Sequence, residues 1–312
     1  MRLVYQQLIL AEWRGNATQA GFYQEPRYAA PLFYAEWAEA DSPRRVIVTT
    51  QVAATDRWVD LSTLPGQVGV LPEEAAFFLK PTPSLPIDGI VKETARRITA
   101  GLTTPLAKAR AIYDWVVDNT YRDPHIQGCG LGDIKTILES GHCGGKCVDL
   151  NSLFVGLSRA AGIPAREVYG LRVAESTQFR RLGKSGDVSQ AQHCRAEFYL
   201  DGIGWVPVDP ADVRKVMLEE NLTITDPRLV ELRQRLFGYW EMNWVGFNYG
   251  RDFKPVPATK QAWRFFMYPY VEAASSTSGG VGPGKFRYQI SAREGDADAF
   301  EENTIVFSQT TL

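Results

Sequence analysis

The chain of 312 residues is 45% hydrophobic and 22% charged, with a formal net charge of −2. This balance is typical of an ordinary globular protein that is long enough for two domains. The charge provides no electrostatic reason to expect nucleic acid or an anionic membrane as a partner. No apolar run approaches the roughly 18–20 residues that cross a bilayer, so we expect no membrane span.

The first residues carry no targeting signal that the sequence pattern identifies. They lack the uninterrupted apolar segment and the small-residue cleavage site of a signal peptide, and they read instead as a strand that starts abruptly. The cellular location is therefore not decided by the sequence. The protein is either made without a leader, or it is the trimmed form of an exported protein that is periplasmic or secreted.

Residues 1–84 are predicted to form a small, mostly β domain. Val46–Val52 is rich in β-branched residues, which favours a strand. The aromatic residues between Phe22 and Trp37 are interpreted as core packing rather than as a ligand site. The proline-rich stretch Pro81–Pro86 then makes a stiff connector, so we place the boundary there and assign a second domain to 85–312.

Two helices are predicted at the start of the second domain. The first spans about 88–100 and ends at Gly101, since glycine tolerates the backbone that terminates a helix. The second starts with Thr104 as N-cap and Pro105 at the first helical position. We expect both helices to pack beside the helix that follows them, without a catalytic role.

A third helix is predicted to begin at Cys147 and to end at Gly162. Between them, apolar residues recur at helical spacing, and Pro164 lies just beyond the glycine. Unpaired N–H groups and the helix dipole at a helix start favour an anion, which lowers the pKa of a cysteine placed there. Cys147 is therefore a candidate nucleophile, and the alternative is that it is a small structural core residue.

A histidine and an aspartate follow in an order that suits nucleophilic catalysis. His193 opens an alternating run that predicts a strand, Asp201-Gly202 predicts a hairpin turn, and the returning strand ends at Asp209. An imidazole can take the thiol proton, while a carboxylate sets its tautomer and orientation. Cys147, His193 and Asp209 thus make a candidate catalytic set.

At these residues the sequence resembles the transglutaminase-like superfamily, whose core has the papain-like cysteine protease fold. The resemblance covers roughly residues 86–215. The motifs that carry it are Gly145-Lys-Cys147, the run Leu153 to Arg159, Gly162-Ile-Pro-Ala-Arg166, His193 with Glu197, and Gly204-Trp205 leading to Asp209-Pro210.

This resemblance implies an α+β fold in which the cysteine-bearing helix packs on an antiparallel sheet, as in bacterial members. It selects Cys147 rather than Cys143 as the nucleophile, because the family nucleophile precedes Gly-Ile-Pro by one full helix, and it assigns the family histidine to His193 and the family aspartate to Asp209. The sequence departs from the family at Arg195, where an aromatic residue is usual. We regard Arg195 as a candidate substrate-binding residue.

Several cysteines and histidines are also candidate metal ligands. Cys143, Cys147, His142 and the pair His193-Cys194 could offer thiolate and imidazole to zinc. However, the cysteine spacing has no second matching pair, and neighbouring strand residues should point to opposite faces. We therefore expect no metal and no cofactor.

A loop ahead of the nucleophile leaves two questions open. The segment 123–131 carries His125 and Cys129, and it either lines a cleft or forms a plain surface connection. Four cysteines are too few for a disulfide scaffold in a chain of this length. The sequence does not decide whether an exported form would carry a single disulfide between Cys129 and Cys143.

The C-terminal part, residues 216–312, is predicted to be an aromatic and β extension. A helical segment is followed by an aromatic stretch that contains Trp240 and Trp244, which either line a substrate cleft or brace the core. A flexible loop is expected over 275–284, a last strand around 286–290 and a solvated acidic run over 294–302.

Three functions are compatible with these residues. The favoured one is cysteine-dependent hydrolysis of an amide bond in a protein or peptide. Transfer of the acyl group to a lysine amine, which would make the protein a cross-linking transglutaminase, is the first alternative. A non-catalytic binding module on the same fold is the second, because the charge of Arg195 near His193 could depress the imidazole pKa. The sequence makes no prediction of oligomeric state.

Overall fold

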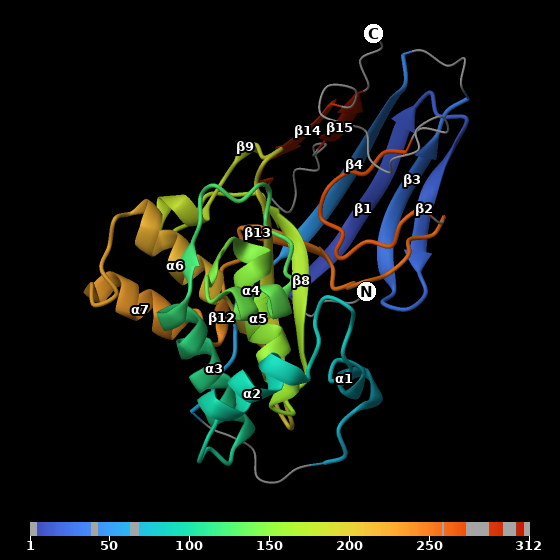
Figure 1. The fold of residues 1–312 in the computed structure, drawn as a ribbon. Coiled ribbons are helices and arrows are strands. Elements are labelled where there is room, and N and C mark those ends of the chain that lie inside the picture. Colours follow the sequence, from blue (N-terminus) through green and yellow to red (C-terminus); the bar gives the residue numbers. More distant parts are fainter. Residues whose placement is uncertain are drawn as a thin grey trace. The chain divides into compact units, whose positions relative to one another are not determined.

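The computed structural model describes residues 5–38, 43–62, 69–257, 259–272, 287–295 and 304–308, the last of these by backbone alone. The chain forms two compact units, each assembled from separate stretches. We call Met1–Thr55, Tyr169–Gln192 and Met242–Leu312 the β unit, and Asp56–Val168 with His193–Glu241 the α+β unit (Figure 1).

The β unit is built around a five-stranded sheet with strand order β1-β4-β15-β14-β9. All of its strand pairs are antiparallel, and β4 lies between an N-terminal and a C-terminal strand. The strands of this sheet are β1 (Gln6–Gly15), β4 (Arg45–Ala54), β9 (Gly186–Asp187), β14 (Arg287–Ala292) and β15 (Thr304–Ser308). The unit also contains β2 (Gln19–Glu25), β3 (Ala30–Glu36), β13 (Trp244–Asn248) and the short 3-10 helix Arg180–Leu182.

The aromatic residues near the N-terminus pack less deeply than the sequence indicated. Most of them lie on the two-stranded ribbon β2-β3. Tyr28 is buried and donates a hydrogen bond to the Arg251 carbonyl. In contrast, Phe22 is 47% exposed and contacts Phe33 edge to face. The core-packing interpretation was wrong for Phe22, because it lies in a strand whose only partner in the ribbon is β3.

The α+β unit places helices against short antiparallel strands. Its strand order is β11-β10-β8, and the hairpin of β10 and β11 pairs Ala196 with Val208. The strands are β8 (Ala165–Arg172, of which 165–168 belong here), β10 (Gln192–Leu200) and β11 (Gly204–Val208). Four two-residue strands form two further pairs. They are β5 (Arg57–Trp58) with β12 (Tyr239–Trp240), which are antiparallel, and β6 (Tyr121–Arg122) with β7 (Gly144–Gly145), which are parallel.

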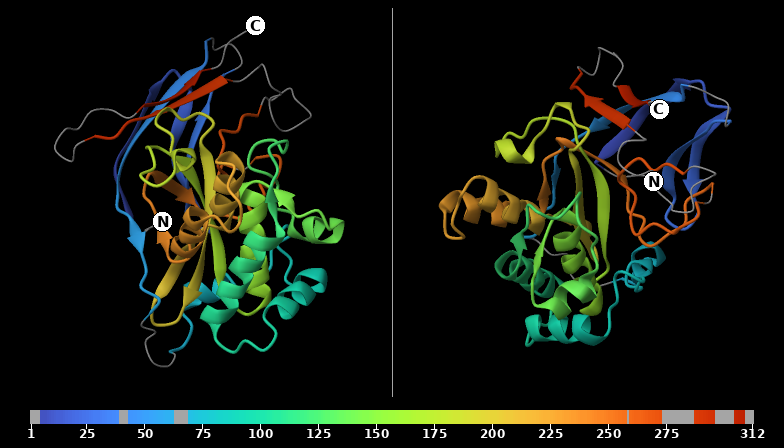
Figure 2. Two further views of the ribbon diagram at one scale, coloured as in Figure 1. Left: turned by 90° about the vertical axis from the view of Figure 1, so that its left-hand side faces the viewer. Right: turned by 45° about the horizontal axis from the view of Figure 1, so that its top comes forward.

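The central helix of this unit is α5 (Cys147–Ala160), which lies along the strands (Figure 2). Its Phe154 contacts Phe198 of β10 edge to face, and Ser152 donates to the buried Glu167 of β8 at 2.7 Å. Four helices contact α5, and α7 contacts one of them, α6. The four are α2 (Gly89–Ile98), α3 (Pro105–Asn119), α4 (Ile134–Ser140) and α6 (Pro210–Glu219), and α7 spans Pro227–Arg235. The unit also contains α1 (Glu73–Phe77).

Several predicted element ends are confirmed. The Thr104 side chain accepts the N–H of Ala107 at the start of α3, with Pro105 as the first helical residue. Gly162 has φ +83° just after α5, the left-handed conformation that glycine adopts without strain. The protein is a mixed helix and sheet structure with small, mostly antiparallel sheets, as predicted.

The two compact units do not divide the chain at residue 84. The segment 56–84 lies in the α+β unit, where β5 pairs with β12 and α1 forms. The linear scheme of 1–84 and 85–312 therefore stays a prediction about folding units. Across the described residues, none of the helices has both the length and the apolar character required to span a bilayer.

Candidate active site

Cys147 is the first residue of α5 and is almost completely buried, with 3% of its surface exposed. The backbone around it is held by two hydrogen bonds. Lys146 N–H donates to Asp149 Oδ2 at 3.0 Å, and Val148 N–H donates to the Cys129 carbonyl at 3.0 Å. The thiol therefore lies at the positive end of the helix dipole on a backbone that is tied down on both sides.

The glycine-rich loop ahead of α4 docks on this helix start. Asp149 Oδ1 accepts the N–H groups of Leu131 and Gly132 at 2.9 and 2.8 Å. Gly130 has φ +91°, and a Cβ there would lie 1.8 Å from Asp149 Oδ2. Cys129 is buried beside Cys147 as a result. The loop that the sequence left undecided thus packs against the candidate nucleophile.

Replacing Gly130 with alanine should displace this loop from α5. The left-handed backbone alone costs about 1–3 kcal/mol for a residue with a Cβ, and the clash with Asp149 adds to it. We expect a lower thermal midpoint together with slower alkylation of Cys147. Gly162→Ala is the matched control, since Gly162 is also left-handed but a Cβ there meets open space. Equal effects of the two substitutions would contradict a specific role for the Gly130–Asp149 contact.

His193 is held by a carboxylate on the neighbouring strand. Its Nε2 lies 2.7 Å from Asp209 Oδ2, and both side chains are buried. Asp209 follows β11 and caps α6, because its Oδ1 accepts the Asp212 N–H at 3.1 Å. The His193 side chain also hydrogen-bonds with Cys147. Since Nε2 lies against the carboxylates, Nδ1 is the ring nitrogen that remains for a hydrogen bond with the thiol.

The surroundings of Cys147 favour its thiolate. Burial by itself raises the pKa of Cys147, but hydrogen bonds from the side chains of Cys129, Cys194 and His193, with the charge of the imidazolium, hold it well below the ordinary value. For Cys194, burial and the contact with Cys147 raise the pKa well above the ordinary value. Of these two thiols, Cys147 is therefore the one whose pKa favours ionisation.

His193 and Cys194 are neighbours on β10, and both side chains hydrogen-bond with Cys147. That they point to opposite faces of the strand stays a prediction. They lie at the first residues of β10, where the strand begins at Gln192.

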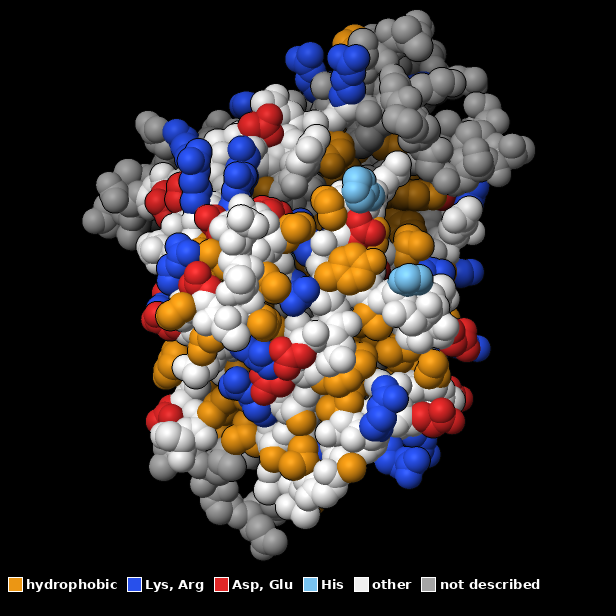
Figure 3. Space-filling model, turned by 60° about the vertical axis from the view of Figure 1, so that its left-hand side comes forward, with side chains coloured by type: hydrophobic (Ala, Val, Ile, Leu, Met, Phe, Trp, Pro, Cys, Tyr) orange, Lys and Arg blue, Asp and Glu red, His pale blue; other side chains and the backbone are white. Residues whose placement is uncertain are grey.

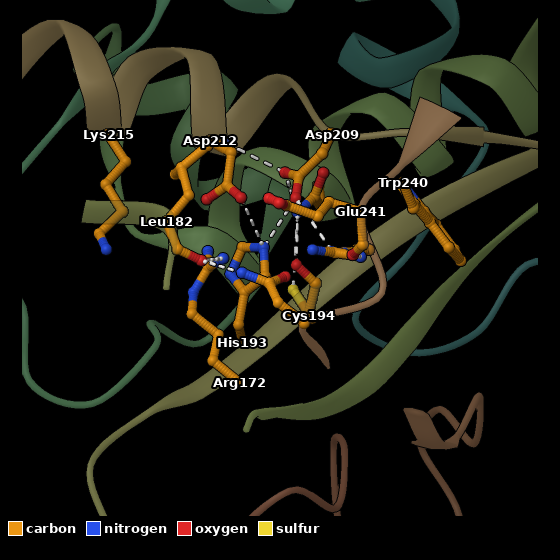
Figure 4. Close-up of polar contacts among 12 residues, drawn as sticks. Arg172, Leu182, His193, Cys194, Asp209, Asp212, Lys215, Trp240 and Glu241 are labelled. Carbon is orange, nitrogen blue, oxygen red and sulfur yellow. Dashed lines mark hydrogen bonds and ion pairs between the residues drawn. The ribbon is translucent and has the colours of Figure 1, made fainter. Parts of the chain in front are cut away.

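A second carboxylate lies beside the first. Asp212 Oδ2 is 3.5 Å from His193 Nε2, and Figure 4 shows both aspartates converging on the imidazole. Burial first, and then the charge of Asp212, raise the pKa of Asp209, while His193 and Arg195 act in the opposite direction. Among the described residues, His193, Asp209 and Asp212 are the group whose potential ligand atoms all lie within 4.8 Å of one another.

Asn151 is a site residue that the sequence patterns did not single out. It lies one turn after Cys147 on α5 and is fully buried. Its Nδ2 donates to the Cys194 carbonyl at 2.9 Å and contacts Asp209 Oδ1 at 3.4 Å. It thus bridges the helix of the thiol to the strands of the histidine and the aspartate. The available signal was an amide side chain four positions after the cysteine, and therefore on the same face of the helix.

The three candidate substrate-binding residues are buried. Arg195 Nη1 donates to the Glu241 carbonyl at 2.8 Å, and its guanidinium lies 5.6 Å from the ring centre of Trp240. Trp240 is fully buried and donates Nε1–H to the Val208 carbonyl at 3.1 Å. Trp244 is fully buried within the β unit. Their role in substrate binding stays a prediction.

The remaining metal and disulfide candidates do not join this cluster. His125 and His142 are exposed, and imidazole rings are visible at the surface in Figure 3. Cys143 is half-buried, and burial raises its pKa. All four cysteines are free thiols, so the disulfide between Cys129 and Cys143 is not formed.

Comparisons with known proteins point to one family. A model of the transglutaminase-like superfamily matches residues 92–210. A protein of Haemophilus influenzae, described only as uncharacterized, is 38% identical over an alignment of 312 positions that covers 93% of this chain and 83% of that protein. Among solved structures, a candidate cysteine protease from Cytophaga hutchinsonii has a TM-score of 0.51 at 17% identity, over 99% of this chain and 89% of that chain. The periplasmic domain of TgpA from Pseudomonas aeruginosa has a TM-score of 0.36 at 15% identity, over 72% and 91%.

Proposed function

Because the chain belongs to the transglutaminase-like superfamily, we propose that it is a cysteine-dependent enzyme that cleaves amide bonds through an acyl-thioester. Cys147 is the nucleophile, His193 the acid and base, and Asp209 the residue that orients His193. The observation that supports this most is the contact of one imidazole with a thiol at a helix start and with a carboxylate 2.7 Å away. That arrangement provides a nucleophile, a proton carrier and an orienting group.

In the first step of the proposed mechanism, the Cys147 thiolate attacks the amide carbonyl. Negative charge then develops on the carbonyl oxygen and must be stabilised by N–H donors. Val148 N–H is already donated to the Cys129 carbonyl, and Lys146 N–H to Asp149. We therefore assign the oxyanion contact at this helix start to the N–H of Cys147.

In the second step, the imidazolium of His193 protonates the leaving amine, and an acyl-thioester forms on Cys147. Asp209 stabilises the imidazolium and keeps Nδ1 directed at the sulfur. Water, deprotonated by His193, then releases the acid. We favour water as the acceptor, because the family motifs resemble a bacterial-style core in which we recognise no acceptor-recruiting motif. The substrate is a protein or a peptide.

The experiment that tests the proposal is iodoacetamide labelling as a function of pH, with each cysteine assigned by mass spectrometry. Exposure alone predicts that half-buried Cys143 labels before Cys147, which is 3% exposed. We expect the reverse, with fast labelling of Cys147 well below the unperturbed thiol pKa of about 8.5 and slower labelling in His193→Ala. Labelling of Cys147 no faster than that of Cys143 would favour the non-catalytic binding module.

Hydrolysis and cross-linking are separated by a second assay. A peptide amide library is incubated with the enzyme, with and without a primary amine such as a lysine derivative. New carboxyl termini or released ammonia without amine incorporation support hydrolysis. Predominant incorporation of the amine into the substrate would instead assign the protein as a transglutaminase.

A further inference from the structure

We propose that Asp212 is a second positioning residue for His193, which together with Asp209 keeps the imidazole charged opposite Cys147. This inference rests on the proposed function. It adds Asp212 to the three residues, Cys147, His193 and Asp209, that the sequence predicts as the catalytic set.

The position of Asp212 is set by the start of α6. Asp209 is the N-cap of this helix, so Asp212 lies in its first turn, and the Asp212 N–H donates to Asp209 Oδ1 at 3.1 Å. The two carboxylates are thereby held on the same side of the helix start. Asp212 Oδ2 lies 3.5 Å from His193 Nε2, and the Asp212 side chain is 3% exposed. Solvent therefore screens this contact little.

The charges around the imidazole favour its protonated form. Two buried carboxylates close together repel each other, and the charge of Asp212 contributes to the raised pKa of Asp209. Arg195 is a cation on β10, the strand that also carries His193, and its Nε lies 3.8 Å from Asp209 Oδ2. A charged His193 is a second cation for this pair of acids, and opposite charges within about 4–6 Å favour the ionised state of both partners.

The other titratable groups near His193 are the Cys147 thiol and the side chains that surround that thiol. Cys147 comes from α5, Cys129 from the glycine-rich loop and Cys194 from β10, and these thiols hydrogen-bond with one another at Cys147. Lys215 lies one turn further along α6, where it pairs with Glu219 at 3.7 Å. The imidazole is therefore in contact with two aspartates and with the thiol that we propose to be ionised, and Arg195 is the cation that partly offsets these charges.

A simpler role for Asp212 is that of a helix-start acid, since an acidic side chain in a first turn interacts favourably with the helix dipole. The two roles predict different results for Asp212→Asn. A helix-start acid changes stability alone, because the amide keeps the shape and loses the charge. A positioning residue changes the pH at which His193 loses its proton.

The test is the rate of Cys147 alkylation by iodoacetamide across the pH range in the wild type, Asp212→Asn and Asp212→Glu. The wild-type profile should show one step where the thiolate forms and an upper step where the imidazolium loses its proton. Removing a negative charge disfavours the imidazolium, so the upper step should move to lower pH by about one unit in Asp212→Asn. Asp212→Glu should restore most of that shift. Glu219→Gln, which removes an acid at the far end of the same helix, should leave the profile unchanged.

The possible outcomes are distinguishable. An unchanged upper step in Asp212→Asn, with a lower thermal midpoint, would overturn the proposal in favour of the helix-start role. A wild-type profile with no reactive Cys147 would overturn the proposed function itself. A profile that shifts when EDTA is added would assign His193, Asp209 and Asp212 to a bound cation and would also overturn the proposal. If Asp212→Asn does not fold, NMR titration of the His193 ring in the wild type and in Asp212→Glu measures the same proton.

Discussion

Replacing Cys147 with alanine should reduce kcat/KM on an amide substrate by at least about 10⁴-fold, since loss of a nucleophile removes the covalent route entirely. The fold should persist, because the change removes one buried sulfur, and small core truncations destabilise by only about 1 kcal/mol. Far-UV circular dichroism and thermal unfolding measure the fold, and steady-state kinetics measure the activity.

The other cysteines provide the controls for that experiment. Cys143 is half-buried and lies ahead of α5, so Cys143→Ala should retain full activity. Cys129→Ala and Cys194→Ala each remove one hydrogen bond to Cys147, so they should raise the pH at which Cys147 becomes reactive without abolishing turnover. Full activity in Cys147→Ala would refute the mechanism. If Cys143→Ala were inactive instead, the nucleophile would be reassigned to Cys143.

Replacing Glu197 with alanine should cause the largest loss of stability, about 3–5 kcal/mol in the free energy of unfolding. Glu197 is fully buried on β10 and accepts from Arg57 Nη1 and Arg166 Nε, both at 2.5 Å. Alanine would leave these two guanidinium groups, themselves buried, without their shared counter-charge. Urea unfolding followed by tryptophan fluorescence measures the loss. A loss below about 1 kcal/mol, the range of an exposed ion pair, would show that the arginines find other partners.

The same residue should make stability depend on pH in the acid range. Burial raises the pKa of Glu197, but the charges of Arg166 and Arg57 outweigh it and place the pKa below the ordinary value of 4.5. A depressed carboxyl pKa stabilises the folded state above the unfolded pKa, and this contribution is lost as the pH falls through the folded pKa. Asp149 and Asp209 have raised pKa values and contribute with the opposite sign. Glu197→Gln should therefore be less stable than the wild type near neutral pH, with a smaller difference in acid.

The sequence by itself determined the local elements and the order of the chemical groups along the chain. The start of α5 at Cys147, the left-handed Gly162, the cap at Thr104 and the β10-β11 hairpin follow from helical periodicity and from glycine, proline and cap residues. These signals are read within a few residues, because they reflect backbone preferences and the repeat of each element.

The tertiary structure alone decided which distant groups meet. Cys129 reaches Cys147 because Asp149 holds the glycine-rich loop, and Asp212 reaches His193 because the start of α6 folds back on the end of β11. Arg57 pairs with Glu197 from 140 positions away, and β4 pairs with β15 near the opposite end of the chain. No local pattern encodes such contacts, since they depend on how helices and strands pack once their apolar faces are buried.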